Sequence, residues 1–230
     1  MEADLLGTER IVVIGAGMGG LAAAIRLAAK GQAVTLIEAL GSPGGKMRAI
    51  PSPAGPIDAG PTVLTMRAVF DDLFALAGER LEDHLTLLPQ AVLARHWWPD
   101  AQAIEAFAGP QEAQAFRRFD RMAGALHRAF DAPVMQAPTP RPGAILSATL
   151  AEPALWPALL PGRSLAGLLK GQFRDPRLAQ LFARYATYVG GRPAFSPAVL
   201  ALIWRAEAAG VWAVEGGMHR LALSLAGLAE

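Results

Sequence analysis

The first forty residues combine two short apolar runs with a helical stretch between them. Residues 11–14 are Ile-Val-Val-Ile, and residues 34–37 are Val-Thr-Leu-Ile. Residues 21–30 lie between the runs and have the pattern of a helix that ends at Gly31. Short, mostly β-branched apolar runs are typical of strands buried on both faces of a parallel sheet. The pattern therefore predicts a strand–helix–strand unit near the N-terminus.

Beyond this unit the pattern is mainly helical. Residues 111–130 place apolar side chains on one stripe and several arginines opposite, which is usual for a core face and a solvated face. Asp175-Pro176 and Ser196-Pro197 are typical of helix starts. Further helices are predicted over residues 67–78, 164–173, 198–209 and 218–229, and short strands over 85–88 and 92–97.

The turn after the first run carries glycines at a spacing that favours phosphate binding. Its sequence is Gly15-Ala16-Gly17-Met18-Gly19-Gly20. Gly15 permits a tight turn, Gly17 lets a pyrophosphate approach the backbone, and Gly20 lets the next helix lie against the strand. The amides at the N-terminus of that helix then face the phosphates. Glycine-rich turns are common, so the motif gains its weight from the flanking strands and helix.

An acidic residue, Glu38, ends the second apolar run. A carboxylate at this place accepts hydrogen bonds from a ribose diol and repels a 2′-phosphate. Taken alone, Glu38 would be interpreted as a solvated strand end. The complete unit favours a dinucleotide site over a glycine turn in an ordinary α/β core.

A second glycine pair, Gly44-Gly45, distinguishes between dinucleotides. Alone it would be interpreted as a turn. It follows Glu38 closely, however, and a nicotinamide dinucleotide has no need of a second glycine pair at this place. The longer pyrophosphate and ribityl chain of FAD need more places where backbone can approach. The sequence therefore predicts FAD as the cofactor. The candidate cofactor-binding residues are Gly15, Ala16, Gly17, Met18, Gly19, Gly20, Glu38, Gly44, Gly45, Lys46, Gly60, Pro61 and Thr62.

Composition excludes several other classes. The 230 residues carry a formal net charge of +1, which gives no indication of a nucleic-acid partner. The absence of cysteine excludes disulfides, thiolate metal sites and flavin attachment through sulfur. The four histidines share no ligand spacing, so no metal site is predicted.

The chain has no segment that reads as a leader or a membrane span. Its first ten residues include two glutamates and an aspartate and lack a signal-peptide pattern. No apolar run approaches the roughly 18 residues that a spanning helix needs. The nearest candidate, residues 144–160, is interrupted by Glu152, Pro153 and Pro157. We expect a cytoplasmic protein, soluble or peripheral on a membrane; the apolar pieces of 144–160 are either buried helices or helices that lie in a bilayer surface.

Seven segments of the chain resemble the carotenoid desaturase family of FAD-dependent oxidoreductases. They follow the family order across nearly the whole chain, and the later ones are more specific than the first glycine motif, which many flavoproteins share. The segments are residues 15–38, 44–48, 58–66, 94–100, 173–178, 181–188 and 210–221.

The resemblance implies an α/β fold, with a Rossmann-like FAD-binding domain and an inserted, mainly helical (α+β) substrate domain. It assigns residues 1–66 and the return segment 210–230 to the FAD domain, and 67–209 to the first part of the substrate domain. Family members continue into further flavin-domain strands, so the chain is expected to be a truncated, N-terminal portion. After Asp100 the family has a glycine turn and a strand, whereas here Ala101-Gln102-Ala103 leads almost directly into residues 104–107. A strand of the substrate domain is therefore expected to be missing.

For activity, the resemblance implies removal of two hydrogens from a saturated C–C bond beside a polyene. Segments such as residues 95–97 and 184–188 favour the branch that 3,4-dehydrogenates 1-hydroxy acyclic carotenoids. The alternatives are a phytoene-type desaturase, a carotenoid isomerase, a saturase, and an inactive fragment that at most binds nucleotide. An amine oxidase shares the first motif but needs an aromatic cage formed largely by residues that are not present.

The implied partners are an acyclic carotenoid and a membrane surface. The resemblance places the protein peripherally on the cytoplasmic or photosynthetic membrane. It predicts no catalytic residue and no oligomeric state. Arg184, Tyr185 and Tyr188 lie in a family-like segment, and their expected role is core packing or helix–helix contact.

Overall fold

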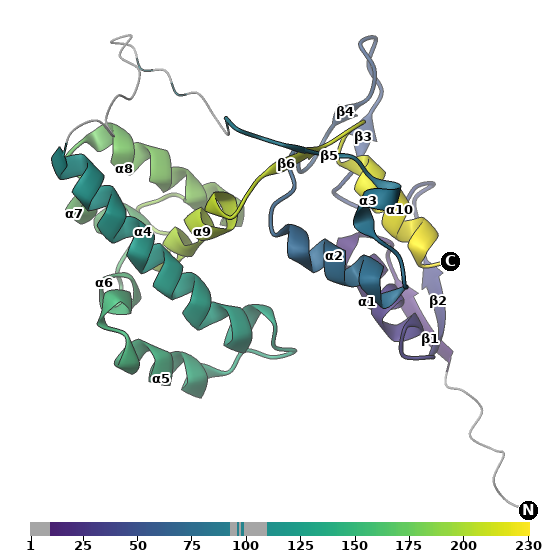
Figure 1. Cartoon of the computed structure of the whole chain (residues 1–230), viewed down its shortest axis with the longest axis horizontal. Helices are drawn as coiled ribbons and strands as arrows, with labels where there is room; N and C mark the ends of the chain where they lie inside the picture. Colours follow the sequence, from purple (N-terminus) through teal and green to yellow (C-terminus); the bar gives the residue numbers. More distant parts are fainter. Residues whose placement is uncertain (1–9, 93–95, 97, 99–109) are drawn as a thin grey trace, which may run out of the picture. The chain divides into compact units, whose positions relative to one another are not determined.

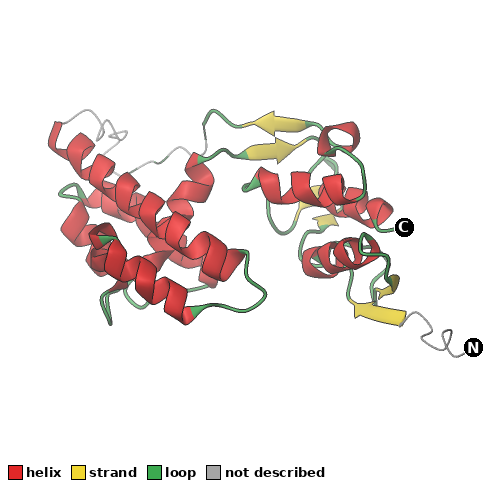
Figure 2. Cartoon of the chain, turned by 60° about the horizontal axis from the view of Figure 1, so that its bottom comes forward, coloured by secondary structure: helices red, strands yellow, loops and turns green. Residues whose placement is uncertain are grey.

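The computed structural model describes residues 10–92, 96, 98 and 110–230. The chain forms two compact units: Met1–Leu93 with Ala209–Glu230, here called the α/β unit, and Ala94–Ala208, here called the helical unit. Among the described residues all strands belong to the α/β unit, as Figure 2 shows in yellow. This compact division differs from the sequence-based one, since the first unit extends to residue 93 and not to 66. The assignment of flavin and substrate to the two units stays a prediction.

The N-terminal part of the α/β unit is the predicted strand–helix–strand unit (Figure 1). It consists of β1 (Arg10–Ile14), α1 (Met18–Ala28) and β2 (Ala33–Ile37). The two strands pair in parallel, in register from Arg10 with Ala33 to Ile14 with Ile37. Leu21, Ala24 and Ile25 are the buried residues of α1. The predicted elements are confirmed here.

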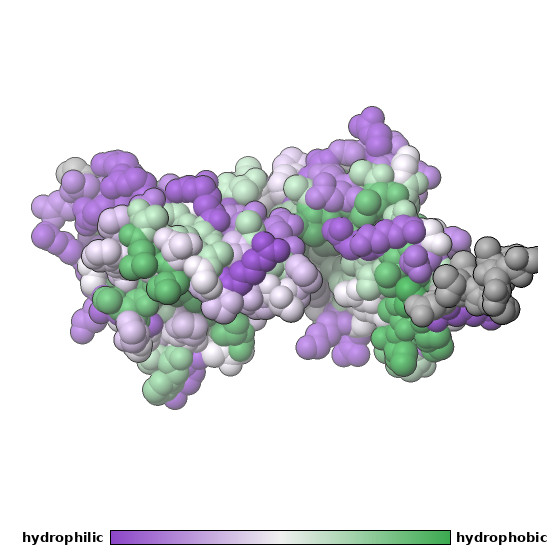
Figure 3. Space-filling view, turned by 90° about the horizontal axis from the view of Figure 1, so that it is seen from below, coloured by the Kyte–Doolittle hydropathy of each residue, from purple (hydrophilic) through white to green (hydrophobic). Residues whose placement is uncertain are grey.

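The prediction that β1 is buried on both faces is wrong. Exposure alternates along both strands, and Val12, Ile14 and Ile37 are 53%, 87% and 50% exposed. Successive strand residues face opposite sides of a sheet, so these three share one face. In the described part of the chain no helix packs over that face, while Leu36 contacts the core on the other. Figure 3 shows apolar side chains (green) at the surface of both units.

Two antiparallel strand pairs and three helices complete the α/β unit. Leu64 and Trp212 exchange two backbone hydrogen bonds, of 2.7 and 2.9 Å, which joins its N-terminal and C-terminal parts. The strand predicted over 85–88 is confirmed as β5, which begins two residues later, at Leu87, and ends at Pro89. Three stretches discussed above lie largely outside the described residues: the strand predicted over 92–97, the family-like segment 94–100 and the apolar residues 104–107. Of these, the structure describes Val92, His96 and Trp98. The elements are β3 (Ala49–Ile50) paired with β4 (Ile57–Asp58), β5 (Leu87–Pro89) paired with β6 (Trp212–Val214), α2 (Arg67–Leu76), α3 (Leu81–His84) and α10 (His219–Leu228).

The helical unit packs around an aromatic core. Phe119 and Phe182 are buried, with ring centroids 4.5 Å apart, and Phe173 and Tyr185 contact the Phe182 ring. The predicted apolar stripe on α4 and the predicted Asp175 cap are confirmed; Asp175 Oδ1 accepts the Arg177 amide at 2.8 Å. The elements are α4 (Pro110–Phe130), a π-helical turn (Asp131–Met135), α5 (Pro142–Ala151), α6 (Trp156–Leu159), α7 (Leu165–Gln172), α8 (Pro176–Ala183), α9 (Ile203–Ala208) and 3₁₀ turns at Pro153–Leu155, Arg184–Val189 and Ala198–Leu202.

Helix α5 is apolar and exposed. None of its residues is buried, and Leu146 and Leu150 are 61% and 67% exposed. It contains no charged residue. Helix α5 is therefore not buried against any of the described residues. No helix among the described residues is long and apolar enough to cross a membrane.

Candidate functional site

The first glycine turn joins the end of β1 to the start of α1. Gly15 has φ +95°, in the left-handed region that favours glycine, and its amide donates to the Ile37 carbonyl at 2.7 Å. Gly17 is the N-cap residue of α1 and offers no side chain to cap it. The first amides of this eleven-residue helix therefore have no side-chain cap, and the anion that the motif predicts for them stays a prediction.

The glycines of this turn are needed for different reasons. A Cβ on Gly20 would lie 1.8 Å from the Gly15 carbonyl oxygen, so the chain's own backbone excludes it. A Cβ on Gly17 would meet no atom within 4 Å, and its φ of −72° suits any residue. The protein's own packing therefore gives no reason for glycine at position 17. The space above it is open for a group from outside the chain.

The second glycine pair lies directly against the first turn. Gly44 and Gly17 form a backbone bridge, and the Gly44 amide donates to the Ala16 carbonyl at 2.7 Å. Gly44 and Gly45 have φ +113° and +59°. A Cβ on Gly45 would lie 3.2 Å from the Gly17 Cα. The structure thus brings together the two glycine motifs that the sequence treats as one site.

Glu38 lies at the end of β2 and is fixed by backbone amides. Its Oε2 accepts the Ala16 amide at 2.7 Å and its Oε1 accepts the Leu40 amide at 2.9 Å. These hydrogen bonds, that from Leu40 first, lower the pKa of Glu38, so the carboxylate is ionised at neutral pH. Each oxygen keeps a lone pair for a further donor. Contact of Glu38 with a ribose diol stays a prediction. The hydrogen bond from the Ala16 amide, which holds Glu38 against the first glycine turn, was not predicted from the sequence.

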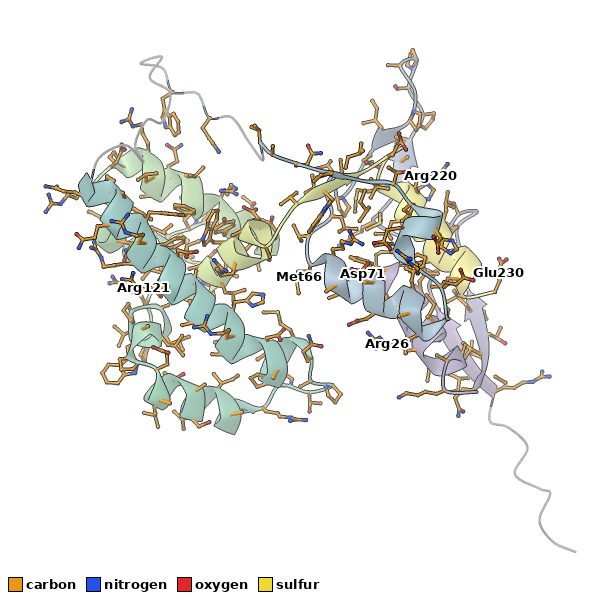
Figure 4. All side chains as sticks on the ribbon, in the orientation of Figure 1. Arg26, Met66, Asp71, Arg121, Arg220 and Glu230 are labelled. Atoms are coloured by element: carbon orange, nitrogen blue, oxygen red, sulfur yellow. The ribbon has the colours of Figure 1, made fainter. Side chains whose placement is uncertain are left out.

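The third group of predicted site residues, Gly60, Pro61 and Thr62, follows β4. The fold itself requires one of them, Gly60. A Cβ on Gly60 would lie 1.9 Å from the Lys46 carbonyl oxygen, so Gly60 lets the two segments approach. Lys46, Pro61 and Thr62 are exposed. The loop after β4 ends at Met66, the N-cap residue of α2 (Figure 4). Met66 has φ +52°, in the left-handed region that is uncommon for a residue with a side chain.

A cavity of about 370 Å³ adjoins Glu38 and the residues that follow it, up to Pro43. Its walls combine apolar side chains with two glutamates, Glu38 and Glu230. A flat ring can lie against the apolar walls while a diol donates to Glu38. The lining residues are Ala16, Leu36, Glu38, Leu40, Gly41, Ser42, Pro43, Ala226, Ala229 and Glu230.

The helical unit contains a polar cluster that sequence reasoning missed. Glu207 on α9 is 9% exposed, and its carboxylate accepts the hydroxyls of Tyr185 and Tyr188, each at 3.0 Å, and pairs with Arg184. Burial raises the pKa of both tyrosines, so they stay neutral donors. The expected packing role is confirmed for Tyr185, which is fully buried, whereas Tyr188 is 60% exposed. The signal in the sequence was one carboxylate within an otherwise apolar stretch at 206–209.

A second cavity, of about 770 Å³, lies in the helical unit between the start of α4 and the α7–α8 turn. Its lining is mixed, with Arg118, Lys170 and Arg174 among the cations. Glu112 also lines it, and its Oε2 is buried without a hydrogen-bond partner among the described residues. Among the described residues no group of three or more His, Asp and Glu side chains could hold a metal ion.

Comparison with known proteins gives close relatives. The chain is 59% identical over 234 residues to a hydroxyneurosporene desaturase of Cereibacter sphaeroides, which covers 96% of the chain and 47% of that relative. Identity to the Rubrivivax gelatinosus hydroxyneurosporene desaturase is 46%, covering 99% and 46%. A Paracoccus phytoene desaturase (lycopene-forming) is 32% identical, covering 100% and 48%. The chain thus spans about half the length of the curated relatives it matches, and the predicted resemblance to carotenoid desaturases is confirmed.

Solved structures confirm the fold class. Cyclohexylamine oxidase from Brevibacterium oxydans has a TM-score of 0.58 at 19% identity, covering 97% of this chain and 49% of that one. The CLA-producing fatty acid isomerase from P. acnes has a TM-score of 0.59 at 16% identity, covering 94% and 48%. The family model described as flavin containing amine oxidoreductase matches residues 18–230. The chain therefore belongs to the flavin containing amine oxidoreductase family.

Proposed function

We propose that the α/β unit binds FAD at the two glycine motifs and Glu38. The observation that carries this proposal is the open space above Gly17, beside a carboxylate and an uncapped helix N-terminus. The α1 amides would hold the pyrophosphate and Glu38 the ribose of the adenosine half, with the cavity beside Glu38 for its ring. Gly44 and Gly45 would admit the chain towards the flavin, next to the exposed Lys46, Gly60, Pro61 and Thr62.

We further propose that the protein containing this chain 3,4-dehydrogenates 1-hydroxy acyclic carotenoids. The support is the 46–59% identity to hydroxyneurosporene desaturases, against 32% to a phytoene desaturase. When bound, the flavin supplies hydride acceptance. The chain's part is to hold that cofactor by backbone amides and Glu38.

A titration separates FAD from a nicotinamide cofactor. Isothermal calorimetry of the 230-residue chain, or of the full gene product, should give tighter binding for FAD than for NAD. Equal or tighter NAD binding would contradict the cofactor assignment.

Turnover assays on the full gene product with hydroxyneurosporene, neurosporene and phytoene then identify the substrate. Preference for phytoene, or isomerisation or reduction of the polyene, would favour the alternative enzymes.

The 230-residue chain by itself should be poorly soluble and inactive. Ile14 and its neighbours leave one face of the β1–β2 sheet bare, and exposed apolar faces favour aggregation. We expect weak flavin retention, association on a sizing column and no 3,4-dehydrogenation by this chain alone. A monodisperse, yellow, active preparation would overturn that expectation and exclude the inactive-fragment alternative.

We also propose that α5 contacts a bilayer surface, which would give access to a substrate dissolved in lipid. Its support is the exposure of Leu146 and Leu150, the lack of charge, and the half-exposed Trp156 beside it. Replacing Leu146 by Glu should reduce co-sedimentation with phospholipid vesicles severalfold. The matched control is Leu223→Glu on α10, a leucine that is 45% exposed in the α/β unit. Equal effects of the two changes would argue against α5 as the contact.

A further inference from the structure

We infer that His219 is a positioning residue for the second glycine loop, residues 42–47, and through it for the flavin site; this rests on the proposed FAD binding. Sequence reasoning treated the histidine as structural and gave it no ligand. It begins α10, 175 positions or more along the chain from the loop that it touches. The loop has two glycines with positive φ, a residue type that loses more backbone freedom than any other when it is ordered, so a side-chain contact adds to the backbone bonds that hold it.

The histidine side chain contacts the loop through one ring nitrogen. Nε2 lies 3.0 Å from the Pro43 carbonyl oxygen and 3.1 Å from Ser42 Oγ. A carbonyl oxygen only accepts, so Nε2 must carry the proton that makes this bond. The contact therefore selects a tautomer as well as a ring orientation.

The loop also lies against the helix at van der Waals distance. A Cβ on Gly44 would be 3.0 Å from the Ala222 Cβ and 3.3 Å from His219 Cδ2. Gly44 in turn donates to Ala16 in the first glycine turn. A continuous path of contacts thus leads from His219 through Pro43 and Gly44 to the turn that would hold the pyrophosphate.

The start of α10 is itself fixed to the flavin-type segments. Asp58 Oδ2, at the end of β4, accepts the Met218 amide at 2.9 Å. Gly217 has φ +94°, and a Cβ there would lie 3.1 Å from Asp58 Oδ1. This carboxylate holds the residue immediately before His219, so the imidazole is presented to the loop from a rigid base.

A loop that is held in its binding conformation loses less entropy when ligand arrives. Loss of the His219 contact should therefore weaken FAD binding about tenfold, which is the scale of one ordered side-chain contact. The protein core need not change, because the neighbouring Leu221, Ala222 and Leu225 supply the buried face of α10.

A set of His219 variants tests this inference through FAD affinity, measured by quenching of flavin fluorescence on the full gene product. His219→Ala and His219→Asn should bind FAD about tenfold more weakly, since neither side chain reaches Pro43. His219→Gln should bind within about threefold of wild type, because its Nε2–H extends as far as the imidazole nitrogen. The control is His127→Ala in the helical unit, which should leave affinity unchanged.

Amide hydrogen exchange gives a readout that needs no FAD. Exchange at Gly44 and Gly45 should be faster in the Asn variant than in the Gln variant of the apoprotein. Equal affinity of the Asn and Gln variants, or equal exchange at the two glycines, would overturn the inference. Failure of the wild type to bind FAD would instead overturn the proposed function, and the exchange data would still decide the role of His219.

Discussion

The two units of the chain place polar groups by different means. In the α/β unit the candidate site is mostly backbone: amides at the start of α1, the two glycine motifs and one carboxylate, Glu38. In the helical unit the polar cluster is made of side chains: Glu207 holds Arg184, Tyr185 and Tyr188 beside an aromatic core. The first arrangement depends on glycines, which have no side chain, and the second depends on the side chain of Glu207 and its partners. Adding a side chain should therefore do most damage in the α/β unit, and removing one should do most damage in the helical unit.

The largest effect is expected from adding bulk at Gly20. Gly20→Val would force a side chain to 1.8 Å from the Gly15 carbonyl oxygen, so the turn between β1 and α1 could not form. We expect the α/β unit to lose at least about 3 kcal/mol of folding stability. Thermal unfolding followed by circular dichroism would measure this. Gly227→Ala on α10, where a Cβ meets nothing within 4 Å, is the matched control and should unfold like wild type.

The next effect is expected from removing Glu207. Glu207→Ala leaves the partly buried Arg184 without its carboxylate and two tyrosine hydroxyls without an acceptor. Because the Arg184 side chain is 31% exposed, the cost should be about 2–3 kcal/mol, below that of a fully buried pair. Denaturant unfolding should show it, and FAD affinity should not change. Glu152→Ala, an exposed glutamate of the same unit, should cost nothing measurable; a matching loss there would remove the distinction.

Gly17→Val should separate binding from folding. Its Cβ position is open, so the melting temperature should stay within a few degrees of wild type. The branched side chain would occupy the space proposed for the pyrophosphate, and FAD affinity should fall more than about 100-fold. A valine variant that purifies yellow would contradict the phosphate site. Together with Gly20→Val it distinguishes a glycine needed by the ligand from one needed by the chain.

The smallest of these effects is expected at Glu38. Glu38→Ala should weaken FAD binding about tenfold, because it removes hydrogen bonds and leaves the amides of α1 in place. The pKa of Glu38 is lowered in the folded chain, so the folding stability that Glu38 contributes is present above the unfolded-state pKa and is lost as pH falls through the folded value. Protonation of Glu38 in acid also removes the acceptor proposed for the ribose. FAD affinity of the wild type should therefore fall in acid, and that of the alanine variant should fall less. Glu215→Ala, an exposed glutamate of the same unit, is the control for charge.

The sequence predicted the parts of the molecule that depend on local sterics. Gly15 and Gly20 lie close together in the sequence, and with the flanking strands and helix they predict the tight turn and the helix contact that the structure shows. The phosphate approach at Gly17 stays a prediction. Glu207 could not be predicted, because its partners at 184–188 reach it only through tertiary packing. The burial of β1 was predicted wrongly for a related reason. An apolar residue such as Ile14 indicates that another element should pack against it, but burial depends on whether that element is there. The predicted domain boundary at residue 66 came from the family resemblance. The resemblance gave no information on the contacts of Leu64 with Trp212 and of β5 with β6, which extend the compact unit beyond that residue.

The chain leaves the α/β unit at Leu93 and returns to it at Ala209, and this has a consequence for the order of folding. During synthesis the segment with β1, α1 and β2 emerges first, but Leu221 and Leu225 of its core are made only after the whole helical unit. Contacts of such long sequence separation require closure of a loop of more than one hundred residues, which slows folding. The helical unit, which is continuous in sequence, should therefore become protected first, and the nucleotide-type turn should stay open until α10 arrives. His219, near the start of that helix, is then among the last residues to be placed and fixes a loop that was made among the first.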